Sequence, residues 1–168
     1  MKRPIPSYRL HVRAFRALRA EQLAHPIERC AIIICTDDNN PVATLFPEMQ
    51  RITLPFADVT NAHRPDAFHA SDAHALVQFV YSLPDRVTDL YICCHRGESR
   101  SAAVAAALML ASGTSDRTIW NDPHYHPNPL VFSILCRAFG IFMPSPLVRL
   151  RTYRSRRALH RAIQGKQQ

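Results

Sequence analysis

Residues 89–108 decide the fold of this chain, and they read DLYICCHRGESRSAAVAAAL. The first six residues form a short apolar run, which is typical of a buried strand. A polar loop follows from His95 to Arg100, and the alanine-rich stretch behind it favours a helix that stops at Gly113. A strand, a tight loop and a helix in this order are typical of an α/β domain.

The flanking sequence continues the alternation of strands and helices. We expect a buried strand over residues 30–35 and another over 51–56, where Pro55 restricts the strand to an edge or an end. Helices are expected over residues 7–24, 71–83, 128–139 and from 144 onward, with loops at 57–70 and 114–126. The sequence therefore predicts an α/β fold with a central, mainly parallel sheet flanked by helices.

Charge divides the chain into a body and two basic ends. Its 168 residues suit one domain over 1–168, with a core at about 29–140 and helical ends. The ends, 1–20 and 145–168, carry six and seven basic residues and no acid. All 13 acids and the other eight basic residues lie between them, so the body nets −5 although the chain nets +8. The ends are either solvated helix faces or docking sites for an anionic partner, such as nucleic acid or an acidic surface.

Cysteine usage and hydropathy indicate a cytoplasmic protein. The five cysteines are an odd number without metal-ligand spacing, which is typical of reduced intracellular thiols rather than a disulfide scaffold. No run of about 18 apolar residues is present, so we expect no transmembrane segment. The basic N-terminus lacks the apolar region of a secretory signal.

The loop after residue 94 has the composition of an oxyanion site. Backbone N–H groups in a tight loop that leads into a helix attract an anion together with the helix N-terminus. Gly97 supplies the freedom that the turn needs, and the planar guanidinium of Arg100 can hold two phosphate oxygens. We therefore assign phosphate binding to His95, Arg96, Gly97, Glu98, Ser99 and Arg100.

Cys94 is the candidate nucleophile at the start of this loop. The positive field of the loop favours the reactive thiolate, which can attack a bound phosphorus in line and form a phosphocysteine. Ser101 can donate its hydroxyl to the sulfur and stabilise the thiolate as a leaving group. A packed core thiol is the alternative for a cysteine in an apolar run. The combination with Gly97, Arg100 and Ser101 favours the nucleophile.

Residues Cys94 to Ser101 resemble the C-x-x-G-x-x-R-S loop of the cysteine-dependent protein tyrosine and dual-specificity phosphatases. The resemblance extends over about residues 29–140 and is strong only in the loop. It implies a small phosphatase that needs no cofactor and no metal. One position departs from the family, which usually has a histidine before the nucleophile to hold the loop and tune the thiol, whereas this chain has Cys93. We expect Cys93 to face away from Cys94 as a core thiol, with a redox partnership as the alternative.

The resemblance also implies a general acid, an aspartic acid on a separate loop some thirty residues before the nucleophile. Asp58 lies 36 residues before the nucleophile and is our candidate, with Asp66 on the same loop as the runner-up. Asp72 is expected to cap a helix, and Asp37 and Asp38 are expected to be turn residues.

Histidines and one asparagine complete the set of candidates. His63, His69, His74, His124 and His126 lack the helical i, i+4 pairing with a carboxylate that a zinc hydrolase uses, so we expect loop histidines rather than metal ligands. Asn128 is expected to cap a helix or to brace the phosphate loop.

The preferred function is hydrolysis of phosphomonoesters, with protein phosphotyrosine first and dual specificity next. Phosphoinositides and RNA 5′-phosphates are further substrates that relatives with shallow pockets accept. Two other functions stay open. The first is a pseudo-phosphatase that binds phosphorylated partners without turnover. The second is a nucleic-acid-associated protein that acts through its basic ends.

Overall fold

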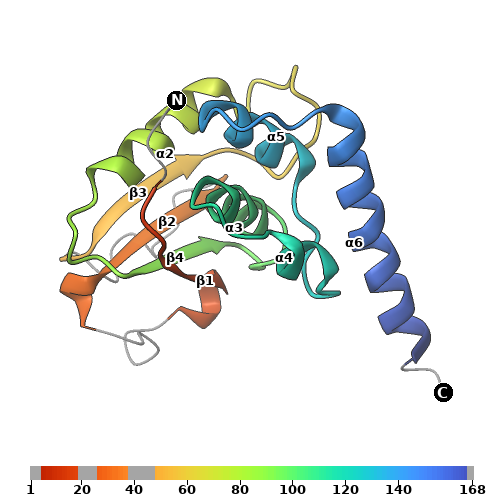
Figure 1. The fold of residues 1–168 in the computed structure, drawn as a ribbon, viewed down its shortest axis with the longest axis horizontal. Coiled ribbons are helices and arrows are strands. Elements are labelled where there is room, and N and C mark those ends of the chain that lie inside the picture. Colours follow the sequence, from red (N-terminus) through yellow and green to blue (C-terminus); the bar gives the residue numbers. More distant parts are fainter. Residues whose placement is uncertain (1–4, 19–25, 38–47, 166–168) are drawn as a thin grey trace.

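A parallel four-stranded sheet forms the centre of the fold (Figure 1). The computed structural model describes residues 5–18, 26–37 and 48–165. The strand order is β1-β4-β2-β3, and the bounds are β1 Arg9–Ala14, β2 Cys30–Thr36, β3 Gln50–Pro55 and β4 Asp89–Cys94. The two central strands, β2 and β4, are buried along their whole length, as continuous apolar runs in a parallel sheet require. Strand β3 lies at an edge of this sheet and ends at Pro55, as predicted.

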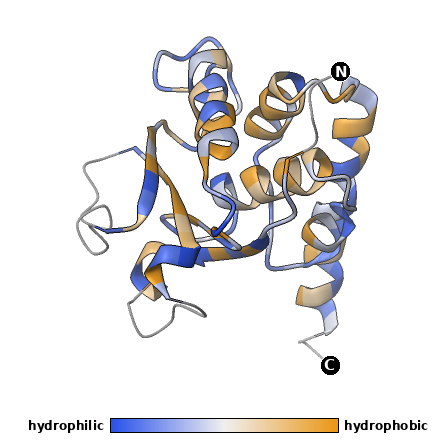
Figure 2. Cartoon of the chain, turned by 60° about the vertical axis from the view of Figure 1, so that its left-hand side comes forward, coloured by the Kyte–Doolittle hydropathy of each residue, from blue (hydrophilic) through white to orange (hydrophobic). Residues whose placement is uncertain are grey.

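Helices cover one face of the sheet and a smaller apolar cluster covers the other. The α-helices are α2 Ala70–Ser82, α3 Arg100–Ala111, α4 Arg117–Asn121, α5 Pro129–Ala138 and α6 Ser145–Gly165. Side chains of α2, α3 and α5 share one apolar core with the sheet, and Figure 2 shows hydrophobic residues gathered on their inner sides. The opposite face packs against two short 3₁₀ helices, η1 Phe15–Ala17 and η3 Ile27–Arg29.

Helix α3 is the innermost helix and fixes the loop that precedes it. Every residue from Arg100 to Leu108 is buried, and five of these nine are alanines. Small side chains let the helix backbone lie close to the sheet, so the start of the helix has little room to shift. The helix ends before Gly113, which has the positive φ of +79° that a glycine stop provides.

The expected helix over residues 7–24 is wrong. Residues 9–14 form β1, η1 follows, and residues 19–25 lie outside the described part of the chain. Strand β1 pairs in parallel with β4, and Leu10 and Val12 pack into the helical-side core. These two apolar residues alternate with Arg9, His11 and Arg13, so a period of two was present in the sequence beside the helical spacing.

Two further local expectations need correction. Helix α2 begins at Ala70, one residue before the expected start, and its N-cap residue is His69 rather than Asp72. Asp72 acts from the third helical position, where its Oδ2 accepts the His69 N–H at 2.8 Å. The expected loop at 114–126 contains α4, whose buried Trp120 donates its Nε1–H to Asp116 Oδ2 at 2.9 Å.

Helix α6 is the expected C-terminal helix, and its far end extends past the body of the molecule (Figure 1). Arg151 donates to Asp116 from Nε at 2.8 Å and from Nη2 at 3.3 Å. Ser155 Oγ donates to the carbonyl of Tyr125 at 2.8 Å. The inner side of α6 is therefore fixed to the body. None of the helices in the described ranges has the length and apolar character needed to cross a bilayer.

Asp89 is buried at the start of β4, where three groups stabilise its carboxylate. His11 Nε2 donates to Oδ1 at 2.8 Å, while Arg9 and Thr88 donate to Oδ2 at 2.9 and 2.8 Å. Burial alone would raise the pKa of Asp89. The hydrogen bonds outweigh burial, so the pKa of Asp89 lies below its ordinary value.

We expect Asp89→Asn to lower the free energy of unfolding at pH 7 by about 1–3 kcal/mol, because Arg9 and His11 lose a charged acceptor. A depressed carboxyl pKa stabilises the fold above the unfolded-state value of about 3.9, and that contribution disappears as the pH falls through the folded-state pKa. Urea unfolding of the wild type and of Asp89→Asn should therefore give free energies of unfolding whose difference becomes smaller below about pH 4. A difference of constant size from pH 7 to pH 2 would contradict this account.

Candidate active site

The loop after β4 lies at the carboxyl edge of the sheet, where three strands bring their following residues together. Residues 95–99 connect β4 to α3, Asp37 follows β2, and residues 56–58 follow β3. Open parallel sheets bind their ligands at this edge. Asp37, Asp58 and Cys94 line one cavity here.

Cys94 lies at the base of this cavity with two hydrogen-bonding partners. Its Sγ is 3.0 Å from Ser101 Oγ and accepts the N–H of Gly97 at 3.2 Å. The side chain is buried, with the residue 2% exposed. Ser101 and Gly97 thus contact the sulfur of Cys94 from the start of α3 and from the loop.

Gly97 packs against the backbone of β1. Its φ is +73°, and a Cβ at this position would lie 2.6 Å from the backbone N of Ala14 and 2.8 Å from the carbonyl carbon of Arg13. Both the backbone conformation and the close approach exclude a larger residue. The end of β1, which is distant from the loop in the sequence, thus supports the loop in the folded protein.

We expect Gly97→Ala to remove most activity and to lower the melting temperature. A left-handed conformation costs an alanine about 1–2 kcal/mol, and the contact with Ala14 forces the loop or β1 to shift as well. Gly113→Ala is the matched control, because Gly113 has φ +79° but its Cβ would meet no atom within 4 Å. Thermal unfolding and turnover of both variants test this, and equal activity in the two would show that the contact with β1 is unimportant.

Arg100 is held in place from the β3 side. Its Nη1 donates to the carbonyl of Phe56 at 2.8 Å and lies 3.4 Å from Asp37 Oδ1. The guanidinium carbon lies 5.9 Å from the centre of the Phe56 ring. Arg100 is 4% exposed, and its buried Nε has no hydrogen-bond partner among the described residues. A buried cationic donor of this kind is costly unless it meets an acceptor, and a phosphate oxygen is a suitable one.

Of the two candidate acids, Asp58 lies in the cavity and Asp66 does not line it. Asp58 Oδ1 accepts from Ser99 Oγ at 2.9 Å and from Asn128 Nδ2 at 2.8 Å. Asp66 is exposed and forms a bidentate pair with Arg64, at 2.8 and 2.6 Å. The hydrogen bond from Arg64 lowers the pKa of Asp66, which opposes a role as a proton donor.

Asn128 performs both of its expected tasks. Its Oδ1 accepts from the N–H groups of Leu130 and Val131 at 3.0 and 3.3 Å, which caps α5. Its Nδ2 donates to Asp58, and its own N–H donates to the carbonyl of Ser99 at 3.4 Å. The start of α5 therefore positions both the acid loop and the phosphate loop.

The cavity has a volume of about 800 Å³ and includes two residues that sequence reasoning missed. Its lining consists of Asp37, Asp58, Cys94, His95, Arg96, Glu98, Ser99, Arg100 and His126. Asp37 pairs with Arg100 rather than serving only a turn, while Asp38 lies outside the described residues. His126 is held beside the loop because its N–H donates to the carbonyl of Glu98 at 2.9 Å. Two features of the sequence could have indicated these residues. Asp37 follows an expected strand, and His126 lies two residues before Asn128.

Cys93 faces away from Cys94, as expected. Its side chain packs with Ile32, Ile34 and Tyr91 on the opposite face of the sheet. Burial raises the pKa of the Cys93 thiol to about 12. A disulfide between the two cysteines would require the chain to leave the strand conformation, because their Cβ atoms point to opposite faces.

The histidine clusters do not assemble into a metal centre in the described part of the chain. Within residues 5–18, 26–37 and 48–165, no three His, Cys, Asp or Glu side chains are arranged to hold a metal ion. His69 is the N-cap residue of α2, and His74 hydrogen-bonds Gln78 at 3.1 Å. Local roles account for these two side chains.

The chain thus has a parallel sheet, a buried cysteine before the loop and a buried arginine at the start of the next helix, which fits the resemblance that its loop sequence suggests. Among solved structures, the chain is similar to human DUSP28, a dual-specificity-phosphatase-type protein. The TM-score is 0.50 at 19% identity, over 91% of this chain and 94% of that one. This likeness confirms the predicted fold class.

Two further solved structures are similar to this chain, with lower TM-scores. A variant of human DUSP28 gives a TM-score of 0.48 at 20% identity, covering 95% of this chain and 99% of that one. PTPMT1 in complex with PI(5)P gives 0.40 at 14% identity, covering 79% and 81%. No protein-family model and no curated protein matches the chain.

Proposed function

We propose that this protein is a cysteine-dependent phosphatase that hydrolyses phosphomonoesters through a phosphocysteine intermediate. The observation that carries the proposal is the position of Cys94. Its sulfur accepts the N–H of Gly97 and hydrogen-bonds Ser101, in a cavity that Arg100 and Asp58 also line. A nucleophile, an anion clamp and a carboxyl group thus share one site, as phosphate ester cleavage needs.

In the first step, the phosphate group binds in loop 95–100 and Cys94 attacks its phosphorus. The S–P bond forms while the bond from phosphorus to the ester oxygen breaks, and Asp58 gives its proton to that leaving oxygen. Arg100 and the loop N–H groups stabilise the charge on the phosphoryl oxygens. The hydrogen bonds from Ser99 and Asn128 support this role, because they hold the Asp58 carboxyl in the cavity.

In the second step, water releases the phosphate. The Asp58 carboxylate, now deprotonated, takes a proton from a water molecule whose oxygen attacks phosphorus, and the S–P bond breaks. The departing thiolate of Cys94 accepts a hydrogen bond from Ser101, which lies 3.0 Å away. The products are inorganic phosphate and the restored Cys94 thiolate.

Phosphotyrosine and phosphoserine or phosphothreonine in proteins are the proposed substrates, which makes the activity dual-specific. The cavity has a volume of about 800 Å³, and no Phe, Tyr or Trp is among its described lining residues. A polar lining of this kind favours acceptance of several phosphate esters over selection of one aromatic ring. We also propose a cytoplasmic location, since all five cysteines are buried and none of them forms a disulfide.

The test is hydrolysis of a generic aryl phosphate by the purified protein from pH 5 to pH 8. Rapid acid quenching followed by peptide mass spectrometry should place a phosphate on Cys94 during turnover. Absence of turnover across this range would overturn the enzyme proposal. Binding of phosphate or vanadate without turnover would then assign the pseudo-phosphatase function.

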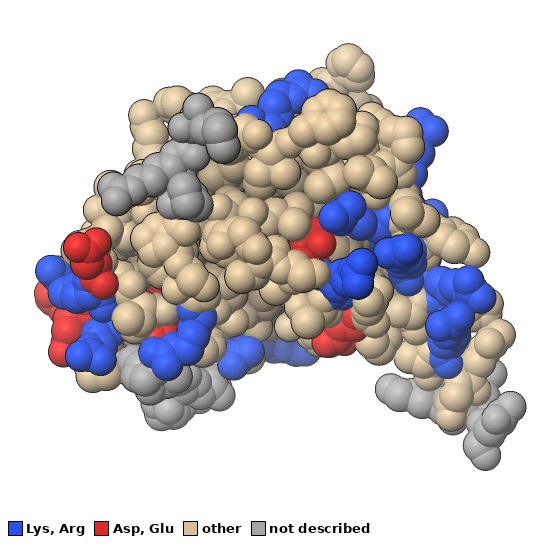
Figure 3. All heavy atoms as spheres, in the orientation of Figure 1, with Lys and Arg blue, Asp and Glu red and all other residues tan. Residues whose placement is uncertain are grey.

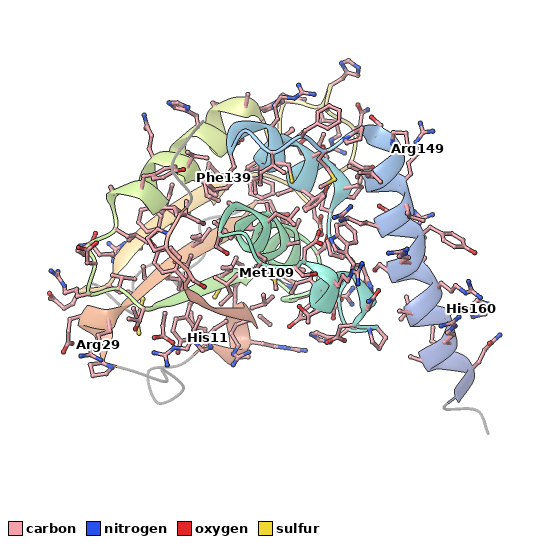
Figure 4. All side chains as sticks on the ribbon, viewed as in Figure 1. His11, Arg29, Met109, Phe139, Arg149 and His160 are labelled. Carbon is pink, nitrogen blue, oxygen red and sulfur yellow. The ribbon has the colours of Figure 1, made fainter. Side chains whose placement is uncertain are left out.

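A second function, binding of nucleic acid, is favoured by α6. Exposed arginines cover its outer side, at positions Arg149, Arg154, Arg156, Arg157 and Arg161. Figure 3 shows Lys and Arg gathered along this helix, and Figure 4 shows Arg149 and His160 projecting from it. The inner side of α6 is fixed to the body by Arg151 and Ser155, so the exposed arginines are held on the side that faces away from the body. We propose that α6 binds RNA or DNA through its phosphates.

Binding of a fluorescent single-stranded RNA at several salt concentrations tests this proposal. Five phosphate contacts predict a slope of about −3.5 for log K against log salt. Gln at positions 154, 157 and 161 together should weaken binding and flatten the slope, while Gln at the exposed Arg29, Arg51 and Arg86 is the matched control. Equal loss in both triple variants, or no salt-dependent binding by the wild type, would overturn it. Selective binding to anionic vesicles instead would assign a membrane surface.

A further inference from the structure

We propose that the cavity between β1, α3 and α4 binds an amphipathic carboxylate with an alkyl chain of about eight to ten carbons, whose head group pairs with Arg13. This cavity is separate from the catalytic one, because no described residue lines both. The inference goes beyond the proposed phosphatase function and does not depend on turnover, so each of the two is tested by its own measurement.

Aliphatic side chains form much of the lining of this cavity, which has a volume of about 380 Å³. They come from β1, α3 and α4, and they are Leu10, Val12, Ala105, Leu108, Met109 and Ile119. Met109, labelled in Figure 4, is half-buried, and its flexible thioether side chain can adapt to a ligand. Ligand cavities are typically about 300–1,000 Å³, so the volume favours an alkyl chain of medium length over a long lipid chain.

Residues 5–8 form another wall of the cavity and are attached to the body of the molecule. Ile5 is buried in the apolar core that the helices share with the sheet. Tyr8 Oη donates to the carbonyl of Val80 at 3.4 Å. The cavity is therefore bounded by the N-terminal segment as well as by β1, α3 and α4, and a ligand in it would be enclosed on several sides.

Arg13 is the one charged residue among the described residues that line this cavity. Its side chain is exposed, and its Nη1 donates to the carbonyl of Val12 at 3.1 Å. It forms no ion pair with a described residue, so the guanidinium is available to an anion. The hydroxyl groups of Thr118 and Tyr125 also line the cavity. One guanidinium and several hydroxyls beside aliphatic side chains match a ligand with a single anionic head and an apolar tail.

Tyr125 lies near Arg13 and can donate a further hydrogen bond to the head group. Burial and the carboxylate of Asp122 raise the pKa of Tyr125, while the guanidinium of Arg13 acts in the opposite direction. The phenol therefore keeps its proton at neutral pH. A carboxylate can accept hydrogen bonds from both side chains, and its charge strengthens them, whereas a neutral alcohol of the same chain length lacks that charge.

Arg13 and Tyr125 also connect this cavity to the loop between β4 and α3. Gly97 packs on the peptide that follows Arg13, and a Cβ on Gly97 would lie 2.8 Å from the carbonyl carbon of Arg13. The residue after Tyr125 is His126, whose N–H donates to the carbonyl of Glu98 at 2.9 Å. A head group held by Arg13 and Tyr125 would restrain both contacts, so we expect the bound ligand to slow the local opening of the loop.

The first test is calorimetric titration of the purified protein with sodium octanoate and with octanol. We expect the wild type to prefer octanoate by on the order of 10-fold, Arg13→Gln to lose this preference and Arg13→Lys to recover part of it. Arg16→Gln is the matched control, because Arg16 is exposed in the same segment and does not line this cavity. From hexanoate to decanoate, each methylene should raise the affinity about 2- to 4-fold. Equal affinity for octanoate and octanol in the wild type, or an equal loss in Arg16→Gln, would overturn the site.

The second test locates the ligand by NMR of the methionine methyl groups. Octanoate should shift the signal of Met109 and leave that of Met49 unchanged, since Met49 packs on the opposite face of the sheet. Thr118→Trp puts a large ring at an exposed position of the lining and should prevent both the shift and the binding. Binding that persists in Thr118→Trp, or a shift of Met49 alone, would overturn the site. Amide hydrogen exchange over residues 95–99 should slow several-fold with octanoate, and unchanged exchange would overturn the connection to the loop.

Discussion

Cys94→Ser is expected to lower kcat for an aryl phosphate by on the order of 10⁴-fold or more, because a serine hydroxyl is a far weaker nucleophile than a thiolate. The substitution preserves the size of the side chain and an acceptor for the Gly97 N–H, which lies 3.2 Å from the sulfur. The loop should therefore still bind phosphate. Steady-state turnover, together with calorimetric binding of phosphate, separates the loss of chemistry from a loss of the site.

Cys93→Ala is the matched control for this experiment. The two cysteines are neighbours in β4, but Cys93 packs on the opposite face of the sheet and its pKa is raised by burial to about 12. Removing its sulfur should cost some stability and leave kcat within a few-fold of the wild type. Comparable losses of kcat in the two variants would indicate that Cys94→Ser acts through the fold and would refute its role as nucleophile.

Asp58→Asn is expected to lower kcat by about 10²- to 10⁴-fold, the usual contribution of a general acid and base. The amide keeps the shape of the side chain and an acceptor for Ser99 or Asn128, but it cannot give a proton to the leaving oxygen. The loss should be greatest for an alkyl phosphate, whose leaving group needs the proton. It should be smallest for an aryl phosphate with a strongly acidic phenol.

Asp66→Asn is the control, since it removes the other carboxyl group of the same loop. Asp66 pairs with Arg64 at the surface and does not line the catalytic cavity. Its substitution should leave kcat and the dependence on the leaving group unchanged. A larger loss in Asp66→Asn than in Asp58→Asn would reverse the assignment of the acid.

The strand, loop and helix from β4 to α3 could be predicted because each signal is local. Three features each specify the conformation of a few residues: the continuous apolar run, the glycine in the tight turn, and the run of alanines. Strand β1 was different, since residues 9–14 fit both an alternating and a helical pattern. These residues form a strand because they pair with the edge of β4 that β2 leaves open. That pairing joins residues about eighty positions apart in the sequence.

The other residues of the site lie close together only in the folded protein, and their spacing in the sequence does not predict this. Asp37 and His126 come from segments that meet only where the strands end, and the sequence gives neither a fixed distance from Cys94. The choice between Asp58 and Asp66 likewise needed the positions of Ser99 and Asn128. Residue type limits the proposed acid to two candidates, and the packing of α5 against the loop favours Asp58 for that role.

The contact between Gly97 and the Arg13–Ala14 peptide also sets the smallest fragment of this chain that can hold a complete site. A fragment limited to the expected core, residues 29–140, would retain Cys94, Arg100 and Asp58. It would lack the Arg13–Ala14 backbone on which Gly97 packs. It would also leave β4 as an unpaired edge strand, which can pair with another molecule. The N-terminal strand is therefore part of the unit that holds the proposed site, so truncations and fusion tags belong before residue 5 and not between β1 and β2.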